Sequence, residues 1–119
     1  MRQFKRSDRL QEQILRDLAT ILQPELGDRF KGMVSFTRVK LSDDLRNATV
    51  YYSYLGDNGV KELLPDYFEN EKGRIRSLIG HGLSMRHIPE LLFKFDPSIE
   101  EGIKLEKLFQ QIKNDRDQS

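Results

Sequence analysis

The chain of 119 residues is 37% hydrophobic and 33% charged, which predicts one globular domain with a core of its own. It contains no cysteine, so disulfides and thiolate metal sites are excluded and the cytoplasm is the expected compartment. The net charge of +1 excludes a bulk polyanion binder of the histone kind, and no apolar stretch reaches the roughly 20 residues of a membrane-spanning helix.

The first predicted element is an amphipathic helix with Ser7 as its N-cap. Pro24 is expected to kink or end this helix, because proline lacks the N–H group that a helix interior requires. Gly27 is expected to close the segment. The apolar face of the helix is predicted to carry Leu10, Ile14, Leu18, Ile21 and Leu22.

Two β-strands are predicted next, joined by a polar turn. In the strand that follows Gly32, the apolar residues change parity after Phe36, so we predict a β-bulge at Thr37–Arg38. Ser42–Asp44 are expected to form the turn, because short polar side chains can hydrogen-bond to their own backbone. The second strand is predicted at residues 47–54, antiparallel to the first. Its buried face is expected to carry Ala48, Val50, Tyr52 and Tyr54.

A helical segment, a third strand and a last helix complete the predicted order. Pro65 fits only the first turn of a helix, so residues 60–64 are expected to form a separate short turn. The third strand is predicted at residues 90–95. Ser98 and Glu101 match a capping box at the start of the last amphipathic helix.

These elements predict an α+β sandwich in which helices cover one face of a small, mostly antiparallel, three-stranded sheet. The predicted order is helix, strand, strand, interrupted helix, strand, helix. Its strand–helix–helix–strand part is the arrangement of KH-type nucleic-acid-binding folds, which favours RNA as a ligand. Residues 1–113 are expected to form this single domain, followed by a flexible polar tail at residues 114–119.

The most informative segment runs from Lys72 to His87 and contains basic residues and glycines but no acid. Its cations, with a second basic cluster near the N-terminus, are predicted to bind phosphates, and Gly73 would let backbone N–H groups approach a phosphate closely. Arg76→Glu should then weaken RNA association strongly and leave folding nearly unchanged. The predicted RNA-binding residues are Lys72, Gly73, Arg74, Arg76, Arg86, Lys5, Arg6 and Arg9.

These signals have second interpretations that the sequence leaves open. The basic run could be the solvated face of an amphipathic helix, and Arg76 or Arg86 could instead be an ion-pair partner inside the protein. For Gly80, close packing of the helix on the sheet is favoured. Among the tyrosines of the second strand, Tyr51 lies off the predicted buried face and is the one that could stack on a base.

Five blocks of the sequence carry a family resemblance: Arg9–Ile14, Gly32–Val34, Leu41–Tyr51, Gly73–Leu78, and Met85–Leu91 continuing through Phe93, Asp96 and Ser98. In this order and at these spacings they resemble the ribosome-binding factor A family, bacterial ribosome-maturation proteins with a type II KH-like fold. The resemblance covers residues 6–113. The family has an Ala-x-Gly interruption between two helices in place of the GxxG loop of ordinary KH domains. Glu71 stands here where that alanine is usual, and Gly73 matches the glycine.

The resemblance implies a non-enzymatic assembly factor that associates with the free small ribosomal subunit. Such a factor helps the ribosomal RNA of that subunit mature at the 5′ end, leaves before translation, and matters especially in the cold. We expect a monomer with no cofactor, no metal and no membrane contact, and a ribosome-associated GTPase is a candidate second partner. One alternative is a protein-interaction module that uses the last helix or a sheet edge. The other is an RNA hydrolase, which the missing carboxylate cluster and GxxxxGK phosphate loop disfavour.

Overall fold

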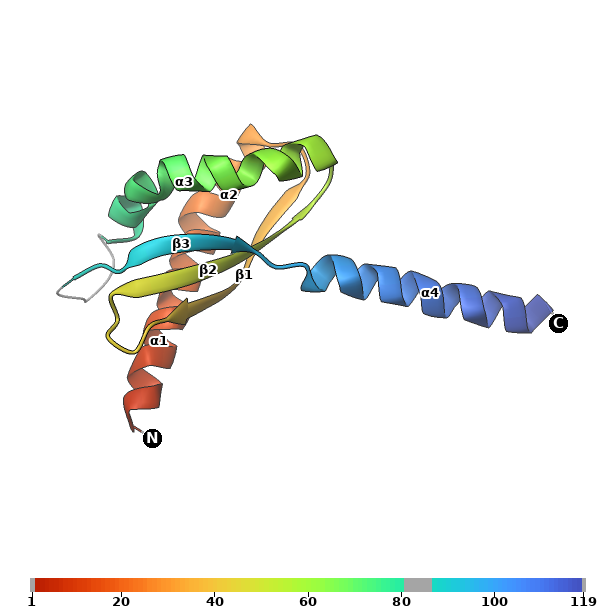
Figure 1. Ribbon diagram of the computed structural model, residues 1–119, viewed down its shortest axis with the longest axis horizontal. Coiled ribbons are helices and arrows are strands. Elements are labelled where there is room, and N and C mark those ends of the chain that lie inside the picture. Colours follow the sequence, from red (N-terminus) through yellow and green to blue (C-terminus); the bar gives the residue numbers. More distant parts are fainter. Residues whose placement is uncertain (1, 81–86, 119) are drawn as a thin grey trace.

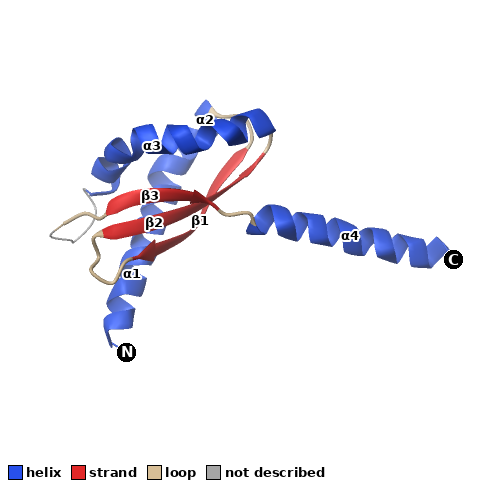
Figure 2. Cartoon of the chain, in the orientation of Figure 1, coloured by secondary structure: helices blue, strands red, loops and turns tan. Residues whose placement is uncertain are grey.

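The computed structural model describes residues 2–80 and 87–118, and the side chains of residues 6–80 and 87–117. A three-stranded sheet lies at its centre, with helices packed on one side and a last helix that projects away from it (Figures 1 and 2). This arrangement confirms the predicted α+β class. The elements in chain order are α1 (Arg2–Asp17), the π-helical turn η1 (Leu18–Leu22), α2 (Gln23–Arg29), β1 (Met33–Leu41), β2 (Asn47–Leu55), α3 (Asn58–Gly80), β3 (Glu90–Phe95) and α4 (Ser98–Gln118).

The strands lie in the order β1-β2-β3, so that β2 is central and the other two are edges. β1 and β2 pair antiparallel, as predicted, whereas β2 and β3 pair parallel. The sheet is therefore mixed rather than mostly antiparallel, because α3 joins β2 to β3 and a helical crossover is the connection that parallel neighbours need. The predicted β-bulge is confirmed: the register shifts between Phe36 and Arg38 and leaves out Thr37.

One face of the sheet and the helices α1 to α3 enclose the hydrophobic core. Phe68 of α3 lies at its centre, with its ring stacked on Phe93 at 4.4 Å between centroids and 4.6 Å from the ring of Tyr52. In Figure 1, α1 passes behind the sheet and α3 runs along the side of β3. The buried residues of this hydrophobic core are Ile14, Leu18, Leu22, Leu26, Val34, Phe36, Val39, Leu41, Ala48, Val50, Tyr52, Tyr54, Leu64, Phe68, Ile75, Ile79 and Leu91. The predicted inner face of β2 is thereby confirmed.

The N-terminal helical segment differs from the prediction in its start and in the way it passes Pro24. α1 begins before Ser7, which therefore lies inside the helix and is not its N-cap. Ahead of Pro24 the helix widens into η1, where the N–H of Gln23 donates to the carbonyl oxygen of Leu18. This wider turn accommodates the proline ring, which in a regular helix would clash with the carbonyl four residues before it. The helix then continues as α2 through Gly27 instead of closing there.

Helix α3 is continuous, so the predicted interruption at Glu71–Gly73 and the predicted separate turn at residues 60–64 are both wrong. Pro65 lies inside the helix on its exposed side, where water can reach the carbonyl group that the proline leaves without a donor. In a helix interior, a proline lowers the stability of the helix by about 3 kcal/mol relative to alanine, and a glycine lowers it by about 1 kcal/mol. Packing of the helix against the sheet outweighs both costs, through the buried side chains of Leu64, Phe68, Ile75 and Ile79.

Helix α4 is held at its base by contacts with other elements. The Asp96 carboxylate accepts hydrogen bonds from the N–H of Ser98 at 2.9 Å and from the hydroxyl of Thr37 at 2.8 Å. These bonds, those from Ser98 first, hold the pKa of Asp96 below its usual range. Lys61 of α3 forms an ion pair with Glu100 at 3.0 Å. Asp96 therefore satisfies the first turn of α4, a role that the capping-box pattern assigned to Ser98.

The rest of α4 projects away from the domain. Every side chain from Glu101 to Asp117 is exposed, including those of five large apolar residues. The helix continues through residues 114–118, the segment for which the sequence predicts a flexible tail. The exposed apolar residues are Ile103, Leu105, Leu108, Phe109 and Ile112.

Candidate nucleic-acid interface

The predicted RNA-binding residues fall into two groups, one on α3 and one on α1. Arg86 and the side chain of Lys5 lie outside the residues that the structure describes. The three cations of α3 all have partners within the protein, whereas Arg6 and Arg9 of α1 are exposed and form no ion pair with a described residue. The two groups therefore differ in how much of their charge is available to a ligand.

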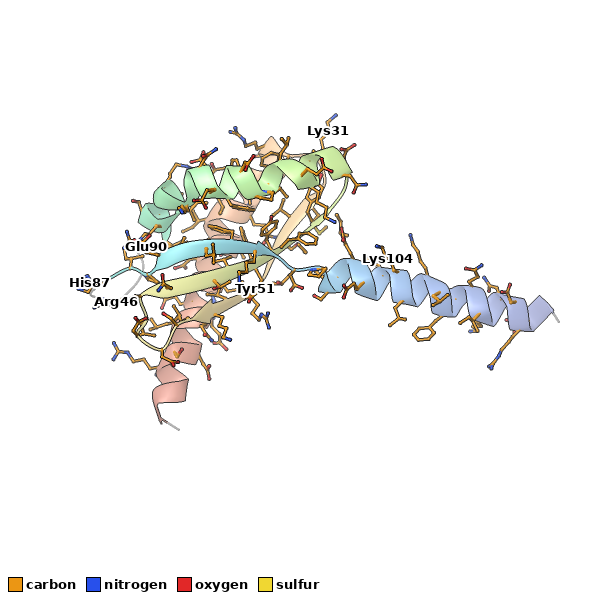
Figure 3. The ribbon with its side chains drawn as sticks, viewed as in Figure 1. Lys31, Arg46, Tyr51, His87, Glu90 and Lys104 are labelled. Atoms are coloured by element: carbon orange, nitrogen blue, oxygen red, sulfur yellow. The ribbon has the colours of Figure 1, made fainter. Side chains whose placement is uncertain are left out.

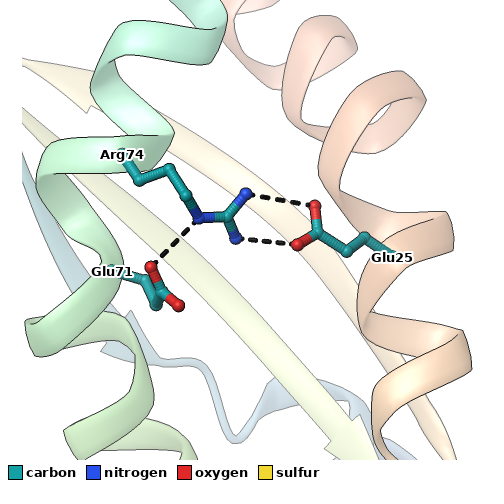
Figure 4. A network of polar contacts seen from close by, with 3 residues as sticks. All are labelled: Glu25, Glu71 and Arg74. Carbon is teal, nitrogen blue, oxygen red and sulfur yellow. Dashed lines mark hydrogen bonds and ion pairs between the residues drawn. The ribbon is translucent and has the colours of Figure 1, made fainter.

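Arg74 joins α3 to α2 (Figure 4). Its terminal nitrogens donate to the two carboxylate oxygens of Glu25, at 2.8 and 3.4 Å, and its Nε donates to Glu71 at 3.0 Å. The hydrogen bonds to Glu25, and then those to Glu71, raise the pKa of the guanidinium above its usual range. Because both carboxylates hold Arg74 in a fixed fork, its main role in the fold is to clamp two helices together. Glu71, at the position where the family resemblance implies alanine, lies on α3 itself and orients Arg74 toward Glu25 of α2.

Arg76 holds the backbone at the entrance to β3. Its Nε and Nη2 donate to the carbonyl oxygen of Ile88, at 3.2 and 2.6 Å, and its Nε also lies 3.2 Å from the carbonyl oxygen of Pro89. Its Nη1 lies 3.5 Å from the carboxylate of Glu90. The structure therefore supports the internal role that the sequence left open. Arg76→Glu would leave these carbonyls without their donor, so it is no longer expected to leave folding nearly unchanged.

Lys72 and Gly73 remain on the surface of α3. The Lys72 ammonium lies 2.6 Å from Glu69 one turn earlier, an exposed pair of the kind that contributes little to stability. A side chain at Gly73 would meet nothing within 4 Å, so no packing contact requires a glycine there. At Gly80, in contrast, a Cβ would collide with the side chain of Ile88. Close packing at Gly80 is therefore confirmed, but its partner is Ile88 in the segment before β3 and not the sheet itself.

A groove lies between the start of α1 and the β1–β2 hairpin. Its volume is 940 Å³, and cations from both sides line it, Arg6 from α1 and Arg38 and Lys40 from β1. Asp8 and Asp43 contribute the opposite charge. In the wall of the groove, the side-chain oxygen of Gln11 accepts a hydrogen bond from the backbone N–H of Leu41 at 2.9 Å, which fixes α1 along this edge of the sheet. The groove thus links the predicted basic cluster of α1 to the sheet.

The sheet face opposite α1 to α3 is the second place where exposed cations gather. We call this surface the open face and define it by Arg38, Lys40, Thr49, Tyr51, Leu92 and Lys94. Tyr51, labelled in Figure 3, lies in its middle, and Arg46 lies beyond it in the hairpin. Within the described residues, neither lysine of the open face forms an ion pair, and Arg38 forms none either. The groove and the open face share Arg38 and Lys40 and form one continuous basic surface.

The described part of the chain lacks the features of two other kinds of site. No group of three or more histidine and acidic residues is placed to hold a metal ion there. None of the described helices is long and apolar enough to cross a membrane.

Comparison with known proteins identifies the family. The family model described as ribosome-binding factor A matches residues 6–109. A ribosome-binding factor A from Desulfitobacterium hafniense is 38% identical over 112 residues, which are 94% of this chain and 90% of the relative. This chain belongs to the ribosome-binding factor A family.

Two solved structures of ribosome-binding factor A share the fold. The crystal structure of the Thermus thermophilus protein has a TM-score of 0.63 at 23% identity. The match covers 74% of this chain and 93% of the Thermus thermophilus chain. Coordinates of the Thermus thermophilus protein fitted into a cryo-EM map of a complex with the 30S subunit have a TM-score of 0.56 at 17% identity. The match covers 77% of this chain and 92% of the Thermus thermophilus chain. The predicted KH-like fold of the family is confirmed by these likenesses.

In this member of the ribosome-binding factor A family, sequence reasoning missed the cations of the open face. Arg38 and Lys40 alternate with the buried residues Val39 and Leu41, and Lys94 follows the same rule in β3. The signal was strand alternation, whereas the prediction relied on local density of charge along the chain. The expectation that Tyr51 lies off the buried face is confirmed.

Proposed function

We propose that this chain is a non-enzymatic assembly factor that binds the free small ribosomal subunit and promotes maturation of its ribosomal RNA in the 5′-end region. Membership in the ribosome-binding factor A family supports this proposal, and so does the Thermus thermophilus relative described in a complex with the 30S subunit. The protein would act as a monomer in the cytoplasm and matter most in the cold.

The continuous basic surface of groove and open face is the observation that carries RNA binding. Its cations are Arg6, Arg38, Lys40 and Lys94, which come from three separate elements. Because Arg74 and Arg76 already serve internal contacts, these exposed cations are better placed to neutralise phosphates. Lys72 and Arg9 would add to the same attraction at longer range.

Binding alone can promote RNA maturation. A protein that binds one conformation of an RNA more tightly than a competing one shifts the equilibrium between the two toward the first, by at most the ratio of the two affinities. The shape of the basic surface would select the RNA conformation, and phosphate contacts would supply salt-sensitive affinity. No chemical step and no conformational change in the protein are needed.

Co-sedimentation with purified ribosomal particles tests this proposal. We expect the protein to sediment with free small subunits and not with large subunits or intact ribosomes, and we expect binding to weaken as salt is raised. Equal binding to all particles would reduce the protein to a generic RNA binder. Absence of binding to small subunits at low salt would contradict the proposal.

A second candidate function is favoured by the exposed apolar residues of α4. Leu105, Leu108, Phe109 and Ile112 follow the spacing of anchors with which a helix docks into a hydrophobic groove of another protein. A protein partner on the ribosome would then add to the RNA contacts or replace them. Small-subunit binding that hardly depends on salt and is lost when these α4 residues are made polar would favour this candidate.

A further inference from the structure

The open face presents an aromatic side chain between two cations. The register places Arg38 of β1 opposite Tyr51 of β2, and Tyr51 opposite Lys94 of β3, so these three form one row across the sheet. Lys40, Thr49 and Leu92 form the next row. Side chains directly opposite on neighbouring strands have Cβ atoms about 5 Å apart. A ligand in contact with Tyr51 is therefore within reach of a cation on either side.

The β-bulge creates this arrangement. Thr37 is the extra residue, and beyond it Val39 points into the core whereas Arg38 and Lys40 point to solvent. With regular alternation from the buried Phe36, Arg38 and Lys40 would have pointed into the core instead. The bulge therefore supplies the open face with two of its three cations.

Tyr51 and Arg38 already form a stacked pair. The guanidinium carbon of Arg38 lies 4.1 Å from the centroid of the Tyr51 ring, a cation–π contact that orients both groups. Tyr51 is half-buried, so part of its side chain is accessible to a ligand, whereas Tyr52 and Tyr54 lie in the core. A flat heteroaromatic ring can stack on such a preformed pair with little loss of side-chain entropy.

The electrostatics of the row favour an anionic ligand. Two carboxylates lie at the ends of the open face, Asp96 next to this row and Glu90 beyond the next row, and both are engaged. Asp96 accepts hydrogen bonds from Ser98 and Thr37, and Glu90 lies 3.5 Å from Arg76. Arg38 is close enough to Asp96 to contribute to the lowering of its pKa, after the hydrogen bonds from Ser98 and Thr37. The two lysines of the open face are exposed and have no carboxylate partner among the described residues.

We propose that the open face binds an unpaired segment of ribosomal RNA, with one base stacked on the Tyr51–Arg38 pair and neighbouring phosphates held by Lys40 and Lys94. This inference rests on the proposed function and adds the class of RNA that the site takes. Bases within a duplex stack on one another and offer no free ring face, so the site selects loops, bulges or ends. Stacking is available to every base, so the site has little sequence preference.

The test places a fluorescent reporter at the site in the full chain. The protein has no tryptophan, so Tyr51→Trp introduces a single one, and a base stacked on it quenches its fluorescence. A short unstructured RNA should quench this signal, whereas the same RNA annealed to its complement should not. In separate variants, Tyr51→Leu should weaken binding of the single strand about 5- to 100-fold and Tyr51→Phe, which keeps the ring, should bind as the wild type does.

Two results would overturn the stacking site. One is equal affinity of folded Tyr51→Leu and wild type for the single strand, and the other is equal quenching of Tyr51→Trp by single strand and duplex. Thermal unfolding of each variant shows that the compared proteins are folded. If the wild type sediments with small subunits and Tyr51→Leu binds single-stranded RNA unchanged, the proposed function stands and this inference fails. If the wild type does not sediment with small subunits, the proposed function itself fails.

Discussion

Phe68→Ala is expected to lower the free energy of unfolding by about 3–5 kcal/mol, as truncation of a buried aromatic side chain generally does. Phe68 is 1% exposed and its ring contacts those of Phe93, Tyr52 and Tyr67, with centroid distances of 4.4, 4.6 and 5.6 Å. The cavity would lie where α3 packs on the sheet. Since a domain of this size has only about 5–15 kcal/mol of stability, this loss is a large fraction of the total. Urea denaturation followed by circular dichroism measures the difference.

Leu63→Ala on the same helix is the matched control. Leu63 is 59% exposed, so its truncation should change the free energy of unfolding by no more than about 0.5 kcal/mol. Equal effects of Phe68→Ala and Leu63→Ala would show that α3 does not pack on the sheet through the Phe68 ring. In that case α3 would no longer be a fixed support for the sheet.

Reversing both lysines of the open face, Lys40→Glu with Lys94→Glu, is expected to weaken small-subunit binding about 15- to 35-fold at about 0.15 M salt. Removing one phosphate contact lowers the affinity by a factor of roughly 4 to 6 at that salt concentration and lowers the salt slope by about one. The slope of log affinity against log salt should therefore fall by about two. Neither side chain has an ion-pair partner among the described residues, so folding should be unaffected. Sedimentation over a salt series measures both quantities.

The control for this double charge reversal changes the net charge of the protein by the same amount, but outside the open face. Lys104→Glu with Lys113→Glu alters two exposed residues of α4. If phosphates contact the open face, this control should keep most of the affinity. Equal weakening by the two double variants would mean that only overall charge matters and that the open face has no special contact with RNA.

Strand alternation made much of the sheet predictable. The change of apolar parity after Phe36 predicted the bulge at Thr37, and β-branched and aromatic residues predicted the position of β2. Both patterns are short-range and depend only on which side chains must face the core. The bulge is also what exposes Arg38 and Lys40, so the information for the open face was present in the sequence, although the predicted site did not use it.

The distant partners of Arg74 and Arg76 could not be predicted from local sequence. Arg74 pairs with Glu25, 49 residues away, and Arg76 donates to carbonyl groups at the entrance to β3. In the sequence, a basic run looks free to bind a ligand when the carboxylates and carbonyl groups that pair with it belong to other elements. The continuous course of α3 through Pro65 and Gly73 has the same cause, because packing on the sheet overrides local propensity.

The parallel pairing of β3 and the projection of α4 also depend on tertiary structure. Nothing in residues 90–95 distinguishes a strand that pairs parallel from one that pairs antiparallel; the helical crossover decides it. The sequence of α4 is amphipathic, yet its apolar residues from Ile103 onward are exposed. Asp96 and the Lys61–Glu100 pair hold only the base of the helix, and the rest of it projects away from the domain.

Lysine acetylation of the protein, free and bound to small subunits, tests most directly whether the open face is the surface that docks. Lys40 and Lys94 report on the open face and Lys72 reports on α3, and each is compared with its own reactivity in the free protein. We expect Lys40 and Lys94 to lose reactivity on binding while Lys72 keeps it. Protection of Lys72 with unchanged reactivity of Lys40 and Lys94 would contradict this interface and would show that the protein docks through α3.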